Sequence, residues 1–261
     1  MARGKPVTDS RLWSELGQAA SMRDGTGPRV AEDIAAQIQG LIISGDLPEG
    51  ARLPSERDLA AMLSASRPTV SQAIRILVVR GLVESRRGSG AYVTGRPEAE
   101  LATAVSLMLD LNQESVQHLS ELRLKLGTTG IEWAIERATA DQVDAGKAAL
   151  EQMNHSAGYV AAWMSADTQF HSTLVRASHN PYLASLYESV HGTLLDYEYQ
   201  AWVKNGTVPA WLRKSQAAAQ IALHEPILEA VRRRDAGLAR QAVLHHHDVM
   251  EQHLRAVADN R

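Results

Sequence analysis

The sequence predicts a mostly α-helical protein in two parts: a short helical segment that ends in a β-hairpin, and a longer all-α bundle. Apolar residues recur at helical spacing through most of the 261 residues. Two short runs with strand character, near residues 82–85 and 91–94, flank a glycine-containing turn and interrupt that pattern. A single Phe leaves a core of mostly Ala, Leu, Val and Ile, which suits helices packed against one another.

Composition excludes several classes of protein. The chain has no cysteine, so it can form neither disulfides nor thiolate metal sites. It has no run of about 18 apolar residues that could span a membrane, and no apolar segment follows the basic start to make a signal peptide. Apolar residues make up 44% of the chain, enough for a real core in one large or two ordinary domains. We therefore expect a cytoplasmic protein without a membrane partner.

The first 28 residues are polar and contain glycine, and we expect a flexible N-terminal arm there. In a second interpretation, Leu12, Trp13 and Leu16 form a short helix that docks elsewhere. From Arg29 onward, helical spacing predicts the first helix of a domain that extends to residue 95, and Gly45 ends this helix.

Two short helices follow, separated by a three-residue turn. Ser55 is suited to cap the first, which carries Glu56 in its first turn and stops near Ser64. Ser66 is suited to cap the second, and Pro68 fits its first turn because the missing N–H costs nothing there. The second helix buries one stripe of apolar residues, spaced i, i+4, i+7 and i+8: Val70, Ile74, Leu77 and Val78.

A helix, a short turn, a second helix and a basic hairpin together predict a winged helix-turn-helix with a small β-hairpin wing. The major groove of DNA admits one helix, whose N-terminal residues reach base edges, and a glycine-tipped hairpin can approach the duplex closely. The face opposite the buried stripe offers polar residues for such contacts: Arg67, Thr69, Ser71, Gln72 and Arg75.

Charge supports double-stranded DNA as the partner. Between residues 66 and 96 six arginines stand against one glutamate, which gives this segment about +5. The whole chain is at −3, so the positive charge is local. The alternative is a small helical core with a solvated hairpin, but the added wing and the local charge favour DNA binding.

Residues 29–94 resemble the DNA-binding domain of GntR-family bacterial transcription regulators. The resemblance is carried by the ordered motifs Ile42-Ile43-Ser44-Gly45-Asp46-Leu47-Pro48-Glu49-Gly50, Leu53-Pro54-Ser55-Glu56-Arg57-Asp58-Leu59-Ala60, Ser66-Arg67-Pro68-Thr69-Val70, Arg80-Gly81-Leu82-Val83 and Gly88-Ser89-Gly90-Ala91-Tyr92-Val93. It implies DNA contacts from Arg57, Ser66, Arg67, Thr69, Arg87 and Gly88, and Ser55 completes our set of candidates. Many members carry Arg where this chain has Ser71, and Gln72 or Arg75 can compensate for that difference.

A domain boundary is predicted at Gly95-Arg96-Pro97-Glu98, because Pro and Gly break the second strand and helical spacing begins after them. The remainder, residues 96–261, shows no strand pattern and no internal repeat. It should form a bundle of six or seven helices, expected at residues 99–110, 114–138, 141–155, 159–178, 181–204, 210–234 and 236–258.

All ten histidines lie in this second part, and some of them fall on apolar helix stripes. Asp167 and His171 are four residues apart and share one helix face, while His224 and His246 lie on stripes of two later helices. A carboxylate and three imidazoles that point into one core must be paired or bound to metal, since unpaired burial is costly. One Asp and three His suit Zn²⁺, Ni²⁺ or Mn²⁺.

The same residues also fit a hydrogen-bonded core without metal. A single buried His is usually a hydrogen-bonded core residue, and an Asp and a His four residues apart can simply bond within their helix. The run His245-His246-His247 also leaves the last ligand ambiguous, because His245 shares a stripe with Leu238, Ala242 and Val249.

The second part resembles the FCD ligand domain found in the FadR subfamily of GntR regulators. The matching motifs are Asp167-x-x-Phe170-His171, then Asn180-Pro181-Tyr182-Leu183, then His224-x-x-Ile227-x-x-Ala230 with Asp235, Ala239 and His246 after it. Many such domains hold a divalent metal with one Asp and three His. The resemblance places these ligands at Asp167, His171, His224 and His246.

Arg123 is the candidate effector-binding residue. Gly127 and Gly130 lie one and two turns further on, and small neighbours leave room for a ligand beside a fixed cation. Spacing alone favours a surface arginine on a long helix. The resemblance favours an effector contact, because the family commonly places such an Arg here, usually with Glu four residues later. This chain has Gly127 instead, so we expect a different pocket wall.

The sequence therefore predicts a ligand-responsive DNA-binding transcriptional regulator. We expect a homodimer on a pseudo-palindromic operator, since one short recognition helix reads few bases. The resemblance favours a repressor released by a small organic or sugar acid bound at the metal. The alternatives are a metal-dependent enzyme on the helical bundle, tethered to a DNA-binding domain, and a regulator whose metal is purely structural. We find no second carboxylate motif and no nucleophile with a partnered base, so we expect no catalytic residues.

Overall fold

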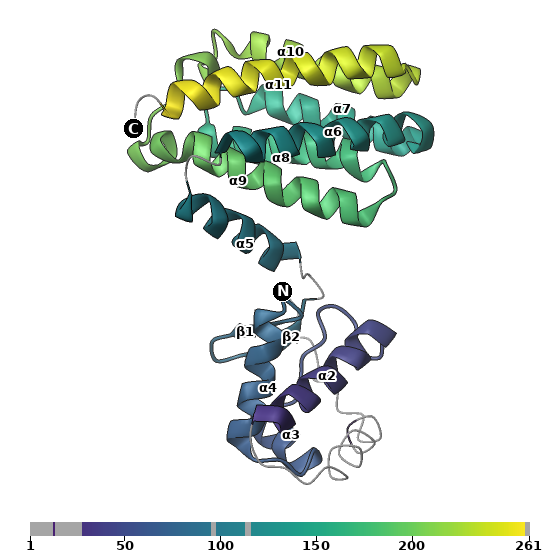
Figure 1. Ribbon diagram of the computed structural model, residues 1–261, viewed down its shortest axis with the longest axis vertical. Coiled ribbons are helices and arrows are strands. Elements are labelled where there is room, and N and C mark those ends of the chain that lie inside the picture. Colours follow the sequence, from purple (N-terminus) through teal and green to yellow (C-terminus); the bar gives the residue numbers. More distant parts are fainter. Residues whose placement is uncertain (1–12, 14–27, 95–97, 113–115, 259–261) are drawn as a thin grey trace. The chain divides into compact units, whose positions relative to one another are not determined.

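Figure 1 shows the computed structural model, which describes residues 13, 28–94, 98–112 and 116–258. The chain divides into two compact units, residues 1–100 and 101–261. The predicted boundary at residues 95–97 lies outside the described residues, as does the predicted N-terminal arm apart from Trp13 and Pro28. The expectation of a mostly α-helical chain with one small hairpin is confirmed.

The first unit is a winged helix-turn-helix. It contains α2 (Pro28–Ser44), α3 (Glu56–Met62), α4 (Arg67–Val79), β1 (Val83–Arg86) and β2 (Gly90–Val93). The two strands pair antiparallel, with Val83 opposite Val93 and Arg86 opposite Gly90.

The predicted caps of the first unit are present. The Ser55 hydroxyl accepts from the Asp58 N–H and the Ser66 hydroxyl from the Thr69 N–H, each at 3.2 Å. After α2, Gly45 adopts a φ of +85°, a left-handed conformation that ends a helix without steric cost.

Apolar stripes of the helices meet the inner face of the hairpin to form the core of this unit. Fully buried members come from α2 to α4 and include Ile34, Ile38, Leu59, Val70 and Leu77. Trp13 is also fully buried and belongs to this core. The stripe predicted for the second helix of the motif is therefore the one that faces inward.

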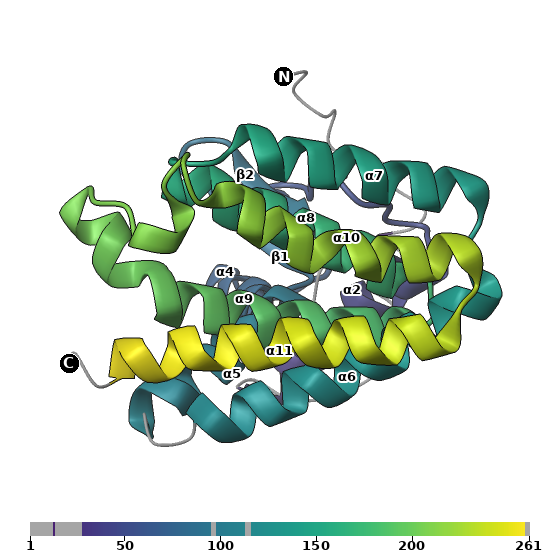
Figure 2. The ribbon, with the colours of Figure 1, turned by 90° about the horizontal axis from the view of Figure 1, so that it is seen from above.

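The second unit is all helical in its described part. It contains α5 (Glu98–Leu111), α6 (Val116–Arg137), α7 (Ala140–His155), α8 (Val160–Arg176), α9 (Pro181–Asn205), the short 3₁₀ helix η2 (Ala210–Leu212), α10 (Ala217–Arg233) and α11 (Ala236–Ala258). Six helices close a ring, because α6 contacts α9, α9 contacts α8, and the contacts continue through α7, α10 and α11 back to α6 (Figure 2).

This ring places the inward faces of α6, α8, α9, α10 and α11 around one core. Phe170 and Leu174 of α8 are fully buried in it, and Asp167 and His171 share their face. No helix in the described ranges is both long and apolar enough to cross a membrane.

The prediction of one helix over residues 210–234 is wrong at its start. Arg213 is extended (φ −61°, ψ 146°) and separates η2 from α10. The cause is a tertiary hydrogen bond: the Leu212 carbonyl accepts from the Gly158 N–H at 2.9 Å. That carbonyl is therefore engaged by another part of the chain instead of by the helix that spacing predicted.

Candidate DNA interface and candidate metal centre

The predicted DNA-binding residues lie at the starts of α3 and α4, along α4 and at the hairpin tip. Most of them are exposed, namely Ser55, Arg57, Ser66, Arg67, Gln72, Arg75, Arg87 and Gly88, while Thr69 and Ser71 are half-buried. At the N-terminus of α4 the Ser66 and Thr69 hydroxyls bond each other at 2.7 Å, beside exposed Arg67. This end of α4 thus offers donors, a cation and the helix N-terminus on one surface.

The two arginines of the wing, Arg86 and Arg87, have different surroundings. Arg86 pairs with Glu84 and lies over the Tyr92 ring, 4.4 Å from its centroid, so it stabilises the hairpin itself. Arg87 is exposed next to Gly88, which has a φ of +69° at the turn. Arg87 is therefore the wing cation best placed for a nucleic acid.

Sequence reasoning missed Arg52. Its guanidinium lies over Gly90, where an added Cβ would come within 3.2 Å of Nε, and it lines a groove with Ser55, Arg57 and Arg67. A basic residue just before Leu-Pro-Ser was visible in the sequence, but only the isolated bridge between Arg52 and Tyr92 shows that it joins the wing.

In the helical unit, the four predicted metal ligands come together from three helices. Asp167 and His171 lie on α8, His224 on α10 and His246 on α11, and all four are at most 8% exposed. The Asp167 Oδ1 atom lies 3.2 Å from Nε2 of His224 and 3.9 Å from Nε2 of His171, and the Nε2 atoms of His224 and His246 are 3.0 Å apart. The three histidines alone form a group that could hold a metal ion.

Hydrogen bonding tests whether these residues fit a cation. His224 donates Nδ1–H to the Gln220 carbonyl at 2.7 Å, so its Nε2 atom is the one that faces Asp167 and His246. Two hydrogen-bond acceptor atoms about 3 Å apart, such as Nε2 of His224 and Nε2 of His246, repel each other unless a proton or a cation lies between them. Zn–N bonds of about 2.0–2.1 Å place tetrahedral ligand atoms roughly 3.3 Å apart, close to the observed separations. Nε2 of His171 is buried without a hydrogen-bond partner in the described structure, so the donor set fits a divalent metal.

Protonation states agree with that fit. Burial opposes the charge of Asp167, but the surrounding imidazoles of His171, His191 and His224 outweigh burial and hold the pKa of Asp167 well below its usual range. Burial lowers the pKa of both His171 and His246 well below the usual range. At neutral pH the carboxyl is therefore ionised and these two rings are neutral, as metal ligands must be.

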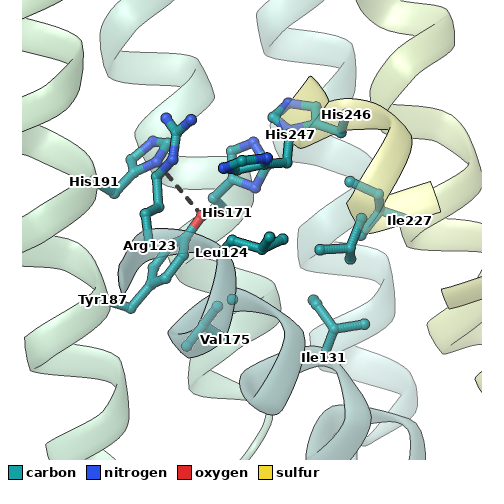
Figure 3. Close-up of a pocket in the computed structure, with 12 residues that line it drawn as sticks. Arg123, Leu124, Ile131, His171, Val175, Tyr187, His191, Ile227, His246 and His247 are labelled. Carbon is teal, nitrogen blue, oxygen red and sulfur yellow. Dashed lines mark hydrogen bonds between the residues drawn. The ribbon is translucent and has the colours of Figure 1, made fainter. Parts of the chain in front are cut away.

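Arg123 lies on α6, is 6% exposed, and lines a small cavity that His171 and His246 also line (Figure 3). Its Nη2 atom is buried and has no hydrogen-bond partner among the described residues. The cavity has a volume of about 40 Å³, and Gly127, Tyr187 and Ile227 form part of its wall. Spacing alone favoured a surface position for Arg123, and that expectation is wrong.

Two family models match the chain. The model of the gntR family of bacterial regulatory proteins matches residues 30–93, and the FCD domain model matches residues 118–249. The chain is a GntR-family regulator with an FCD domain. It is thus a DNA-binding transcriptional regulator of the FadR-like type.

Relatives of this regulator agree with that assignment. Proteins named HTH-type transcriptional repressor NanR from Citrobacter rodentium and Escherichia coli are each 28% identical over 237 residues, which covers 88% of this chain and 87% or 86% of theirs. The solved structure of a GntR protein from Streptococcus agalactiae superposes with a TM-score of 0.64 at 25% identity, and covers 85% of this chain and 99% of that one.

The FCD domain also holds polar residues that sequence reasoning missed. His191 of α9 is 1% exposed and bonds Asp167 Oδ2 through Nε2 at 3.0 Å. Of the ambiguous run on α11, His246 faces the cluster, His245 is exposed, and His247 contacts the Ser120 hydroxyl at 3.2 Å. His191 had no distinguishing signal in the sequence, because α9 is buried around most of its circumference.

Proposed function

We propose that this regulator is a repressor that binds its operator as a homodimer and releases it when a small organic or sugar acid binds beside a divalent metal in the FCD domain. The observation that carries the proposal is a buried guanidinium beside a histidine cluster. Arg123 lines the same cavity as His171 and His246, and its Nη2 atom has no partner among the described residues. A buried guanidinium nitrogen without a partner favours an anionic ligand.

The metal would be Zn²⁺, Ni²⁺ or Mn²⁺, held by Asp167, His171, His224 and His246. When bound, it supplies a Lewis acid with open positions that accept oxygen donors, if the ion is six-coordinate or an expanded zinc. A carboxylate with an adjacent hydroxyl suits two such positions. Arg123 can then receive a second anionic group of the same effector in a bidentate contact.

The size of the cavity links effector binding to a change of structure. A volume of about 40 Å³ holds on the order of one to three water molecules, whereas small-molecule pockets usually measure about 300 Å³ or more. An acid larger than a few atoms must therefore displace the helices that line the cavity, α6, α8, α9, α10 and α11. Such a displacement shifts the population between two dimer geometries with different affinities for the operator.

The homodimer is supported by an outward apolar stripe on α5. Ala104, Leu107, Met108 and Leu111 repeat at i, i+3, i+4 and i+7, and the last three are 56%, 70% and 79% exposed. Val105 and Leu109 on the opposite face already pack within the helical unit. A helix that is apolar on both faces is normally covered on both, and a second copy of the chain is the partner that a pseudo-palindromic operator requires.

The same proposal assigns the protein to the cytoplasm and gives it no catalytic role. The relatives are named as transcriptional repressors, and the imidazoles of His191, His224 and His246 are already engaged with one another or with Asp167. A purely structural metal is the main alternative, because four protein ligands can close a tetrahedral site. In that case, ligand binding at Arg123 would not depend on the metal.

Metal content and ligand binding together test the proposal. Elemental analysis of protein purified without chelator should find about one divalent ion per chain, and the Asp167→Ala and His224→Ala variants should lose it. The matched control is His155→Ala, because His155 is exposed on α7 and its side chain bonds the Glu151 carbonyl of its own helix. A thermal-shift screen of organic acids, with and without chelator, should give shifts only for metal-loaded protein. Wild type without metal, and without a thermal shift when metal is added, would reassign the cluster to a hydrogen-bonded core.

A further inference from the structure

The two carboxylate oxygens of Asp167 face different neighbours. Oδ1 lies toward His224 and His171, at 3.2 and 3.9 Å from their Nε2 atoms. Oδ2 lies on the other side and accepts from Nε2–H of His191 at 3.0 Å. The Asp167 side chain therefore presents one oxygen to the histidine cluster while His191 engages the other.

Both ring nitrogens of His191 are occupied. The carboxylate can only accept, so Nε2 carries a proton, and Nδ1 lies 3.4 Å from the Tyr187 hydroxyl, the contact dashed in Figure 3. The Tyr187 ring also stacks on His191, with centroids 5.3 Å apart and planes at 16°. Burial raises the pKa of Tyr187 well above its usual value, so the hydroxyl keeps its proton. His191 has no lone pair left for a metal.

Gly127 creates the space that Tyr187 uses. An added Cβ at Gly127 would lie 3.1 Å from Cε2 of Tyr187, closer than an ordinary contact. The ring thus lies directly against the α6 backbone, where any side chain would push it away. Gly127, Tyr187, His191 and Asp167 form one chain of contacts from α6 through α9 to α8.

We propose that His191 is a positioning residue for the metal centre, held by Tyr187 and directing Oδ1 of Asp167 toward the ion without binding the ion itself. This inference rests on the metal centre of the proposed function. Hydrogen bonds to the outer side of a ligand fix its orientation, and their loss typically weakens metal binding by roughly 10–100-fold.

Four variants of the full chain separate positioning from ligation. Gln at position 191 can place an amide N–H where the imidazole Nε2–H lies, whereas the shorter Asn cannot reach Asp167. In a chelator-competition assay with Ni²⁺, we expect His191→Asn to weaken binding roughly 10–100-fold and His191→Gln to stay within about threefold of wild type. Tyr187→Phe should weaken binding by a smaller factor, because the stacked ring remains. The control is Tyr182→Phe, since Tyr182 is 82% exposed on the same helix.

A Co²⁺ absorption spectrum of each saturated variant supplies a readout that a general loss of stability would not change. Positioning predicts the wild-type band pattern for His191→Gln. The inference is overturned if His191→Gln loses the metal or changes the spectrum as removal of a ligand does, because His191 would then be a ligand. It is also overturned if His191→Asn binds Ni²⁺ as tightly as wild type. If wild type itself binds no metal, the proposed metal centre is wrong. If wild type binds metal but the His191 variants give either contrary result, only the role of His191 is wrong.

Discussion

Arg67 stands at the first position of α4, where its side chain is 71% exposed and makes a long 3.7 Å ion pair with Glu56. If it reads a guanine edge, Arg67→Ala should cost about 1–3 kcal/mol of specific binding. Fluorescence anisotropy with operator and random DNA measures this loss.

The comparison of the two DNAs decides what Arg67 contacts. A loss on operator alone indicates base recognition, and an equal loss on both would reassign the residue to a phosphate. Arg240→Ala serves as the control, because Arg240 is 70% exposed on α11 and pairs with Glu132 at 3.5 Å. It removes the same charge from the helical unit, where no DNA contact is expected.

We expect Glu198 of α9 to make the free energy of unfolding depend on pH. It is 1% exposed, and burial raises its pKa although His253, 3.6 Å away, acts in the opposite direction. Above about pH 4.5, the value of an unperturbed Glu, the unfolded chain has lost this proton while the folded chain still holds it. This contribution to stability is therefore complete at low pH and is lost as the pH rises through the raised folded pKa.

Glu198→Gln removes that titration. We expect its unfolding midpoint, relative to wild type, to rise between pH 4 and pH 8, and differential scanning calorimetry at matched metal content measures the difference. A difference that stays constant over this range would show that Glu198 titrates in the folded protein as it does in the unfolded chain.

The candidate metal residues were predictable one by one, whereas His191 was not. Asp167, His171, His224 and His246 each interrupt an apolar stripe on a helix with a clear outer face. His191 lies on α9, which is buried around most of its circumference through residues such as Tyr187, Val190, Leu194 and Glu198. A helix without a single buried stripe gives no contrast by which one inward polar residue stands out.

Gly130 permits the close approach of α6 to α8. An added Cβ would lie 2.9 Å from Cγ1 of Val175 and 3.1 Å from Cγ2, and Val is restricted to few rotamers. We expect Gly130→Ala to lower the free energy of unfolding by about 1–3 kcal/mol through overpacking. Chemical denaturation followed by circular dichroism measures the change.

Gly192→Ala on α9 is the matched control, and we expect it to change the free energy of unfolding in the opposite direction. Nothing lies within 4 Å of its added Cβ, so the lower entropy of the unfolded chain should stabilise the protein by about 0.5–1 kcal/mol. Equal effects from both substitutions would mean that helix propensity, and not contact with Val175, determines the result.

The helix ends could be predicted where the sequence carries a local capping signal. Ser55 and Ser66 cap α3 and α4 as predicted, because their hydroxyls act within three residues of themselves. The break between η2 and α10 depends on Gly158, which is more than 50 residues away from Leu212, and no local pattern could reveal it. Arg52 was missed for the same reason, since its place beside Gly90 depends on the fold.

At the scale of the whole molecule, the two units carry different candidate sites. The candidate DNA-binding residues lie on the first unit and the histidine cluster on the second, so under the proposed function an effector would act on DNA through a change that both units share. In the proposed dimer, that change would be the spacing of the two recognition helices. Differential affinity of the effector for two such geometries is the energy available for release of DNA.

The most direct test of this account titrates candidate acids into a preformed protein–operator complex, with DNA release followed by fluorescence anisotropy. The metal-loaded wild type should release operator with an acid that carries a carboxylate and an adjacent hydroxyl. Arg123→Ala and His224→Ala should keep their affinity for operator but lose the response to that acid. An effector without an acidic group, or one that releases DNA equally well from wild type and both variants, would contradict the account.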